Sequence, residues 1–143
     1  MTFIRPGFKL THAGALQVLN AAVDAALAMG VPQCIAIVDE GCNLLAFVRM
    51  DGARVLSIDS STRKAMTAAT TGLPTGSLPE NKALPLAEAT DGRMTNLPGG
   101  LPLLANGQIV GGIGVGSGTS EQDLEIAMAA VTAFEAALAK AHP

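Results

Sequence analysis

The chain has 143 residues and a mass of 14.4 kDa, which suits one domain spanning residues 1–143. Hydrophobic residues make up 49% of the sequence and charged residues only 15%, which argues against a disordered chain. The net charge of −3, the 3% aromatic content and the lack of a basic stripe exclude nucleic acid as a partner. The sequence also has no apolar run of roughly 18 residues, so no membrane contact is expected.

The first half of the chain predicts a helix followed by a strand hairpin. Residues 11–29 have amphipathic spacing, with Thr11 as N-cap and Gly30 and Pro32 at the end. The apolar runs 33–39 and 44–49 predict two strands joined by a turn over 40–43. Both strands are apolar on each face, so we expect the sheet to be covered on both sides.

The second half predicts a helix, then an irregular stretch, then a second hairpin and a last helix. A helix is predicted over 55–71, and residues 72–100 contain four prolines and one expected short helix near 84–89. An irregular segment of this length is usually functional or a covering flap. Asn106-Gly107 then predicts a tight hairpin between strands 101–105 and 108–115, and the last helix is expected over 120–140.

Strands that come in hairpins predict an α+β fold: an antiparallel sheet of four or five strands with helices packed on it. Gly112, Gly114 and Gly116 fall on one face of the last strand, which leaves that face as bare backbone. A helix, a second subunit or a planar ligand could approach it there. The low charge and high alanine and glycine content favour a homo-oligomer, a dimer or larger.

The two cysteines predict no disulfide. Cys34 is expected in a strand and Cys42 in the turn after it, about 20 Å apart by strand rise. The N-terminus shows no signal-peptide pattern. We therefore expect a cytoplasmic protein with reduced thiols.

Histidine is scarce, which limits catalysis by imidazole. His142 is next to the C-terminus, where we expect fraying, so His12 is the one strong imidazole ligand of the folded body. His12 is either an exposed or capping residue of the first helix or an axial ligand or base. No metal-binding set of residues is evident.

Other candidate residues lie beside helices and at strand ends. Lys64 is expected on a flank of the second helix, either in solvent or at a pocket rim holding an anion. Asp39 and Arg49 are expected at opposite ends of the first hairpin, so they cannot form one catalytic pair by themselves. Pro98-Gly99-Gly100 suits a type II turn whose backbone N–H groups could bind a carboxylate.

Several short motifs, in this order along the chain, resemble those of the GlcG/HbpS family of haem-degrading or PduO C-terminal-like domains. They are Val38-Asp39-Glu40-Gly41, Phe47-Val48-Arg49-Met50-Asp51-Gly52-Ala53, Ser57-Ile58-Asp59 with Lys64-Ala65, Leu97 through Leu103, and Gly111 through Val115 followed by Glu121-Gln122-Asp123. The resemblance runs from about Leu10 to Leu138. It implies profilin-like α/β/α layers, a five-stranded antiparallel sheet, with a missed strand expected near 93–97, and assembly into oligomers.

The resemblance also implies a pocket near Asp39, Arg49, Lys64, Pro98, Gly99 and Gly100. The leading interpretation is a small-ligand-binding protein with haem or a related tetrapyrrole as cofactor, His12 as the imidazole ligand, and Arg49 and the 98–100 turn helping to hold it. The alternative is a small catabolic enzyme in which Lys64 or Arg49 holds an organic acid and Asp39 moves a proton. A further alternative is a structural partner domain whose glycine face contacts another protomer.

Overall fold

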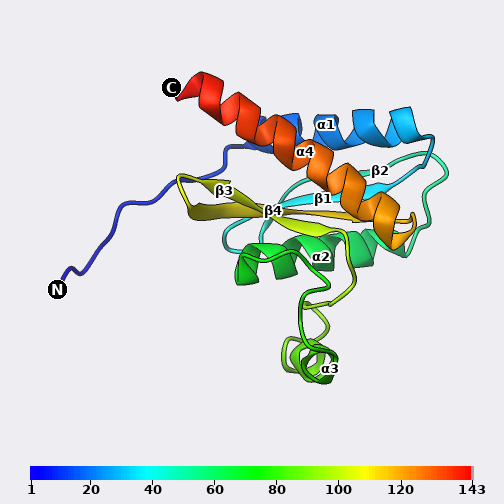
Figure 1. Cartoon of the computed structure of the whole chain (residues 1–143). Helices are drawn as coiled ribbons and strands as arrows, with labels where there is room; N and C mark the ends of the chain where they lie inside the picture. The colour runs from blue at the N-terminus through cyan, green and yellow to red at the C-terminus, as the bar shows by residue number, and fades with distance from the viewer. Residues whose placement is uncertain (143) are drawn as a thin grey trace.

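A computed structural model describes residues 1–142 (Figure 1). Along this part of the chain the elements alternate between helices and antiparallel hairpins. They are α1 (His12–Met29), β1 (Cys34–Asp39), β2 (Leu44–Arg49), α2 (Ser57–Thr71), α3 (Glu80–Ala89), β3 (Gly100–Ala105), β4 (Gln108–Gly116) and α4 (Ser120–Ala141).

The strands form one antiparallel sheet in the order β2-β1-β4-β3. Both predicted hairpins are confirmed, and their inner strands pair with each other, with Ile35 opposite Val115. Of the four or five strands expected, the described residues form four. The fifth strand expected near 93–97 is wrong because this segment bonds to helices and loops instead: the Thr95 N–H donates to Thr67 Oγ1, and Asn96 bonds Leu78.

Helices cover the sheet on both sides, which confirms the α+β class. α1 and α4 lie together on one face and α2 lies on the other, while α3 stands away from the sheet below α2 (Figure 1). The main core lies under α1 and α4 and is built from alanines and branched side chains, among them Ile35, Ile37, Ile113 and Val115. A smaller core lies under α2.

The bare glycine face of β4 lies against α2. A Cβ added at Gly112 would overlap the carbonyl oxygen of Ala65, and one added at Gly114 would overlap that of Ser61. α2 therefore packs directly on strand backbone. The suggestion that this glycine face contacts another protomer is wrong, because a helix of the same chain already covers it.

Local capping explains where the long helices begin and end. The Thr11 side chain accepts from the Gly14 N–H at the start of α1, and Gly30 ends that helix in a left-handed conformation. Thr119 and Gln122 form a capping box at the start of α4. α2 starts at Ser57, two residues later than predicted, with no side-chain cap. None of the helices in residues 1–142 has the length and apolarity needed to cross a membrane.

Candidate functional site

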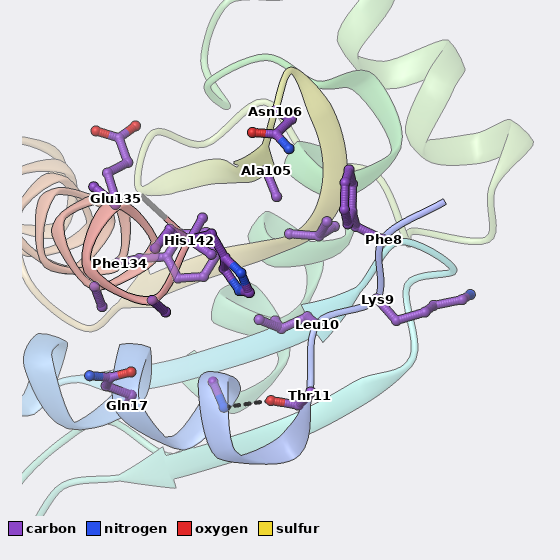
Figure 2. A pocket seen from close by; sticks show the side chains of 16 residues that line it. Phe8, Lys9, Leu10, Thr11, Gln17, Ala105, Asn106, Phe134, Glu135 and His142 are labelled. Atoms are coloured by element: carbon purple, nitrogen blue, oxygen red, sulfur yellow. Dashed lines mark hydrogen bonds between the residues drawn. The ribbon is translucent and has the colours of Figure 1, made fainter. Parts of the chain in front are cut away.

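A groove lies at one end of the molecule, where the ends of several elements converge. Its volume is about 560 Å³, within the range of small-molecule sites. Residues 8–11, the first turns of α1, the tip of the β3–β4 hairpin and the last turns of α4 form its walls. Figure 2 shows these side chains around a common space.

Apolar and aromatic side chains supply most of the groove wall. Phe8 and Leu10 come from the segment before α1, and Phe134 and Leu138 come from α4. His142 also lines the groove (Figure 2). Positions 134, 138 and 142 are four residues apart, so the helix places them on one face. The His142 N–H donates to the Leu138 carbonyl at 2.9 Å, which continues the helical bonding to this residue.

Polar groups sit at the edge of this groove. Lys9 lines it, and its ammonium group pairs with the Glu40 carboxylate. Glu135 and Gln17 also belong to the wall. The groove thus combines an apolar interior with charges of both signs at its border.

His12, the predicted imidazole ligand, is the exposed first residue of α1. Its neighbours Thr11 and Gly14 line the groove, whereas His12 is not among the lining residues. The sequence predicts a frayed His142, but the structure places this residue in the groove wall. The four-residue spacing from Phe134 through Leu138 could have found it.

Lys64 lies in a different region and is not in solvent. Its side chain is only 6% exposed, and its Nζ donates to Asp123 Oδ2 at 3.0 Å and to the Val115 carbonyl at 2.8 Å. Asp123 Oδ1 accepts from the Gly118 N–H at 3.0 Å. The pair joins α2 to α4 beside the sheet. Asp123 is 59 residues away in the chain, and no local pattern marks it as the partner of Lys64.

Pro98, Gly99 and Gly100 close over this buried pair. A Cβ on Gly99 would lie 3.1 Å from Lys64 Nζ and 2.9 Å from the Asp123 Cβ. The Gly100 N–H, expected to be available for a carboxylate, donates instead to Thr75 Oγ1 at 2.8 Å. Pro98 packs against the backbone of Gly76, where an added Cβ would lie 3.0 Å from the proline Cγ. The structure thus brings Lys64, Gly99 and Gly100 together as a packed junction.

Another buried polar group lies beside that junction. The side-chain amide of Gln33 is fully buried and has no hydrogen-bond partner among the described residues. A Cβ on Gly118 would meet Gln33 Nε2 at 2.6 Å and Asp123 Oδ1 at 2.8 Å. The junction is therefore crowded as well as polar.

Asp39 shapes the turn between β1 and β2. Its Oδ1 accepts from the N–H groups of Gly41 at 2.8 Å and Asn43 at 2.9 Å. Partial burial opposes ionisation, but the bonds from Asn43 and Gly41 and the charge of Lys9 hold the pKa of Asp39 below its usual value.

The structure does not gather the residues of the predicted pocket. Asp39 pairs with Gly111, which precedes Val115 on β4 by four residues, and Lys64 contacts Val115. Four residues of strand separate these positions by about 13 Å. Arg49 is exposed and pairs with Cys34, at the far end of the hairpin from Asp39, as the sequence predicts.

The cysteines are both free, as expected. Burial raises the pKa of the Cys34 thiol, and the charge of Arg49 opposes this only in part. Burial together with the charge of Asp39 raises the pKa of Cys42. Neither thiol is an activated nucleophile.

Comparison with known proteins identifies the family. The family described as haem degrading protein HbpS-like matches residues 10–132. The chain belongs to the HbpS-like family. An uncharacterized 15.0 kDa protein of Citrobacter freundii is 35% identical over 130 residues, which cover 87% of this chain and 92% of that protein.

Solved structures agree with this assignment. Protein ORFY of Klebsiella pneumoniae has a TM-score of 0.88 and 32% identity, covering 95% of this chain and 97% of that one. A structure described as a PduOC:heme complex has a TM-score of 0.81 and 30% identity, covering 88% and 95% of the two chains. The family implied by the sequence motifs is therefore confirmed, as is the α+β class with an antiparallel sheet, which has four strands rather than five in the described residues.

Proposed function

We propose that this protein binds haem or a related tetrapyrrole in the groove at the end of α4. The observation that carries the proposal is an imidazole, that of His142, in the wall of an apolar groove of about 560 Å³. Membership of the HbpS-like family and the similarity to a protein solved as a haem complex support it.

The groove residues fit the chemistry of such a ligand. A porphyrin has two broad apolar faces, which the side chains of Phe8, Leu10, Phe134 and Leu138 can cover. His142 supplies the nitrogen that haem iron binds in many proteins. Lys9 at the border offers a positive charge for a propionate once it leaves Glu40.

Bound haem would contribute an iron centre whose reactivity depends on its axial ligand and on how far water is excluded. The chain's own part is to bind and orient the ligand and to shield one side of it. Lys64 and Asp39 take no part in this site. Lys64 is already paired with Asp123, so the structure offers no observation that favours the organic-acid enzyme.

We also propose that the protein acts as a homo-oligomer in the cytoplasm. Two free cysteines suit a reducing compartment. Large apolar side chains remain exposed at several places, among them Leu16, Leu27, Leu56, Leu84 and Met128. Such residues commonly become covered by a second subunit.

A haemin titration followed by visible absorption tests the ligand. The protein has no Trp or Tyr, so ligand bands stand clear of protein absorption. We expect saturation at a defined stoichiometry with a sharp, shifted Soret band in the natural chain. Binding without saturation, or a broad band like that of free haemin, contradicts the proposal.

Four variants locate the site. His142→Ala should change the Soret band and weaken binding, whereas His12→Ala should leave both unchanged. Ala139→Trp adds a large ring inside the groove and should weaken binding, because Ala139 belongs to its wall. Met128→Trp is the matched control, on an exposed position of α4 outside the groove. Equal titrations for Ala139→Trp and Met128→Trp would show that haemin binds elsewhere.

A further inference from the structure

The tip of the β3–β4 hairpin carries a chemically labile dipeptide, Asn106-Gly107. The Asn106 side chain belongs to the groove wall (Figure 2). Both residues are exposed, and both have the positive φ values, 50° and 75°, of a tight hairpin turn. The turn explains why this dipeptide occurs here, but it also places a reactive side-chain amide in the wall of the groove.

An asparagine followed by glycine can lose its side-chain amide without an enzyme. The backbone nitrogen of Gly107 attacks Cγ of Asn106, and a cyclic imide forms. The side-chain nitrogen leaves as ammonia and takes the proton of the Gly107 N–H. Water then adds across one of the two C–N bonds of the imide, with its OH on carbon and its remaining proton on nitrogen. Opening at Cγ gives aspartate, and opening at the backbone carbonyl gives isoaspartate. Water is the co-reactant, and no atom is oxidised or reduced.

The structure of the turn favours this attack. Glycine has no side chain to shield its nitrogen, and a Cβ built on Gly107 would meet no atom within 4 Å. The last ladder pair is Ala105 with Gln108, so neither residue of the dipeptide is held in the sheet. The pairing register also shifts between Leu103 and Leu104, which separates the tip from the rest of the hairpin. The tip can therefore open locally while the sheet stays folded.

The other asparagines of the chain lack this combination. Glycine follows Asn106 alone among them. The side-chain amides of Asn43 and Asn96 are held by hydrogen bonds, and leucine follows each of these residues. Asn20 and Asn81 lie in α1 and α3, where the helix fixes the backbone. Asn106 is therefore the residue at which we expect the reaction.

The reaction would change the charge of the groove wall. The charged side chains there include Lys9, whose ammonium group is matched by Glu40, and Glu135. A carboxylate at position 106 adds a negative charge with no further cation to balance it, and this charge repels ligands that carry carboxylates, as haem does in its propionates. We propose that Asn106 is a site of spontaneous deamidation, and that its carboxylate product weakens binding of an anionic ligand in the groove. The effect on the ligand rests on the haem site proposed above.

Mass spectrometry tests the modification without any ligand. The natural chain is incubated at mildly alkaline pH, and circular dichroism checks that it stays folded. Exchange of NH2 for OH should be found at Asn106 several-fold faster than at Asn96 in the same sample. Asn106→Gly is the matched control, because Gly-Gly suits the same turn and has no side-chain amide. Equal rates at Asn106 and Asn96 overturn the proposal.

Haemin titrations test the effect on the groove. Asn106→Asp keeps a pair that this turn favours, and it should weaken haemin binding about two- to fivefold at low salt and less at high salt. The same incubation should weaken binding by the natural chain but not by Asn106→Gly. Equal affinities of Asn106→Asp and the natural chain overturn the effect on the ligand. If no variant binds haemin, the haem proposal fails and the effect on affinity fails with it, whereas mass spectrometry still decides the modification.

Discussion

On the α1–α4 face, the sheet presents the branched side chains of Ile35, Ile113 and Val115, whereas on the α2 face it presents Ala36 and the backbone of Gly112 and Gly114. Side chains of these strands therefore separate α1 and α4 from the sheet backbone, whereas α2 packs directly on that backbone. The glycine-rich strand, which resembles a ligand cradle in sequence, is a packing device. The groove that we propose as the ligand site lies instead on the other face, between residues 8–11 and the end of α4.

The largest expected effect tests the backbone contact under α2. Gly114→Val should abolish folding or cost more than about 3 kcal/mol of unfolding free energy, because a carbonyl oxygen of α2 cannot move away as a side chain can. Ile113→Val, on the opposite face, should cost about 0.5–1.5 kcal/mol. Urea unfolding of both variants measures the two losses of unfolding free energy. Similar losses would contradict the difference in packing between the two faces of the sheet.

The next effect concerns Lys64, which joins the two helical layers. Lys64→Met should lower the free energy of unfolding by about 3–5 kcal/mol, because it leaves the Asp123 carboxylate buried without its cation. Lys64→Met/Asp123→Asn should be more stable than Lys64→Met alone, since the asparagine removes the charge and keeps an acceptor for Gly118. Lys9→Ala breaks an exposed pair and should cost less than about 1 kcal/mol. The midpoints of urea unfolding test this prediction. It is contradicted if Lys64→Met/Asp123→Asn is no more stable than Lys64→Met.

A smaller effect is expected at the turn between β1 and β2. Asp39→Ala should cost about 1 kcal/mol, because the N–H groups of Gly41 and Asn43 lose their acceptor. The pKa of this carboxyl is lowered in the folded state. Its ionic contribution is therefore fully present above the ordinary pKa of about 3.9 and is lost as the pH falls through the folded-state value.

Thermal unfolding between pH 7 and pH 2 measures this dependence. The difference in unfolding temperature between the natural chain and Asp39→Ala should become smaller as the pH falls. Asp39→Asn keeps a hydrogen-bond acceptor, so its unfolding temperature at neutral pH should lie between those of the natural chain and Asp39→Ala. A difference that does not change with pH would show that the charge of Asp39 contributes nothing.

The sequence predicted much of the fold because its signals are local. Thr11, Gly30 and Asn106-Gly107 act on their immediate neighbours, so the helix ends and hairpins follow from them. The resemblance predicts a strand near residues 93–97, but the hydrogen bonds of this segment go to Thr67 and Leu78, which are distant in the sequence.

The site was harder to predict because it depends on contacts between distant segments. The sequence predicts Lys64 as a cation beside the apolar face of a helix, but its partner Asp123 lies on another helix. The terminal position of His142 predicts fraying, whereas its spacing from Phe134 predicts a place on the same face as the groove-lining residues of α4. The groove lies between the segment before α1 and the end of α4. No local sequence pattern predicts that these two segments are close in space.

The pairing of β1 with β4 has a consequence for how the chain is made. Each hairpin contributes one inner strand, so β1 has an unpaired side until Gln108–Gly116 has been synthesised. On the ribosome, the apolar strand Cys34–Asp39 would keep unpaired hydrogen-bonding groups on one side while nearly half of the chain is synthesised. A nascent chain halted before β4 should therefore be prone to aggregation and a ready substrate for chaperones, whereas one halted after β4 has all the strands of its sheet.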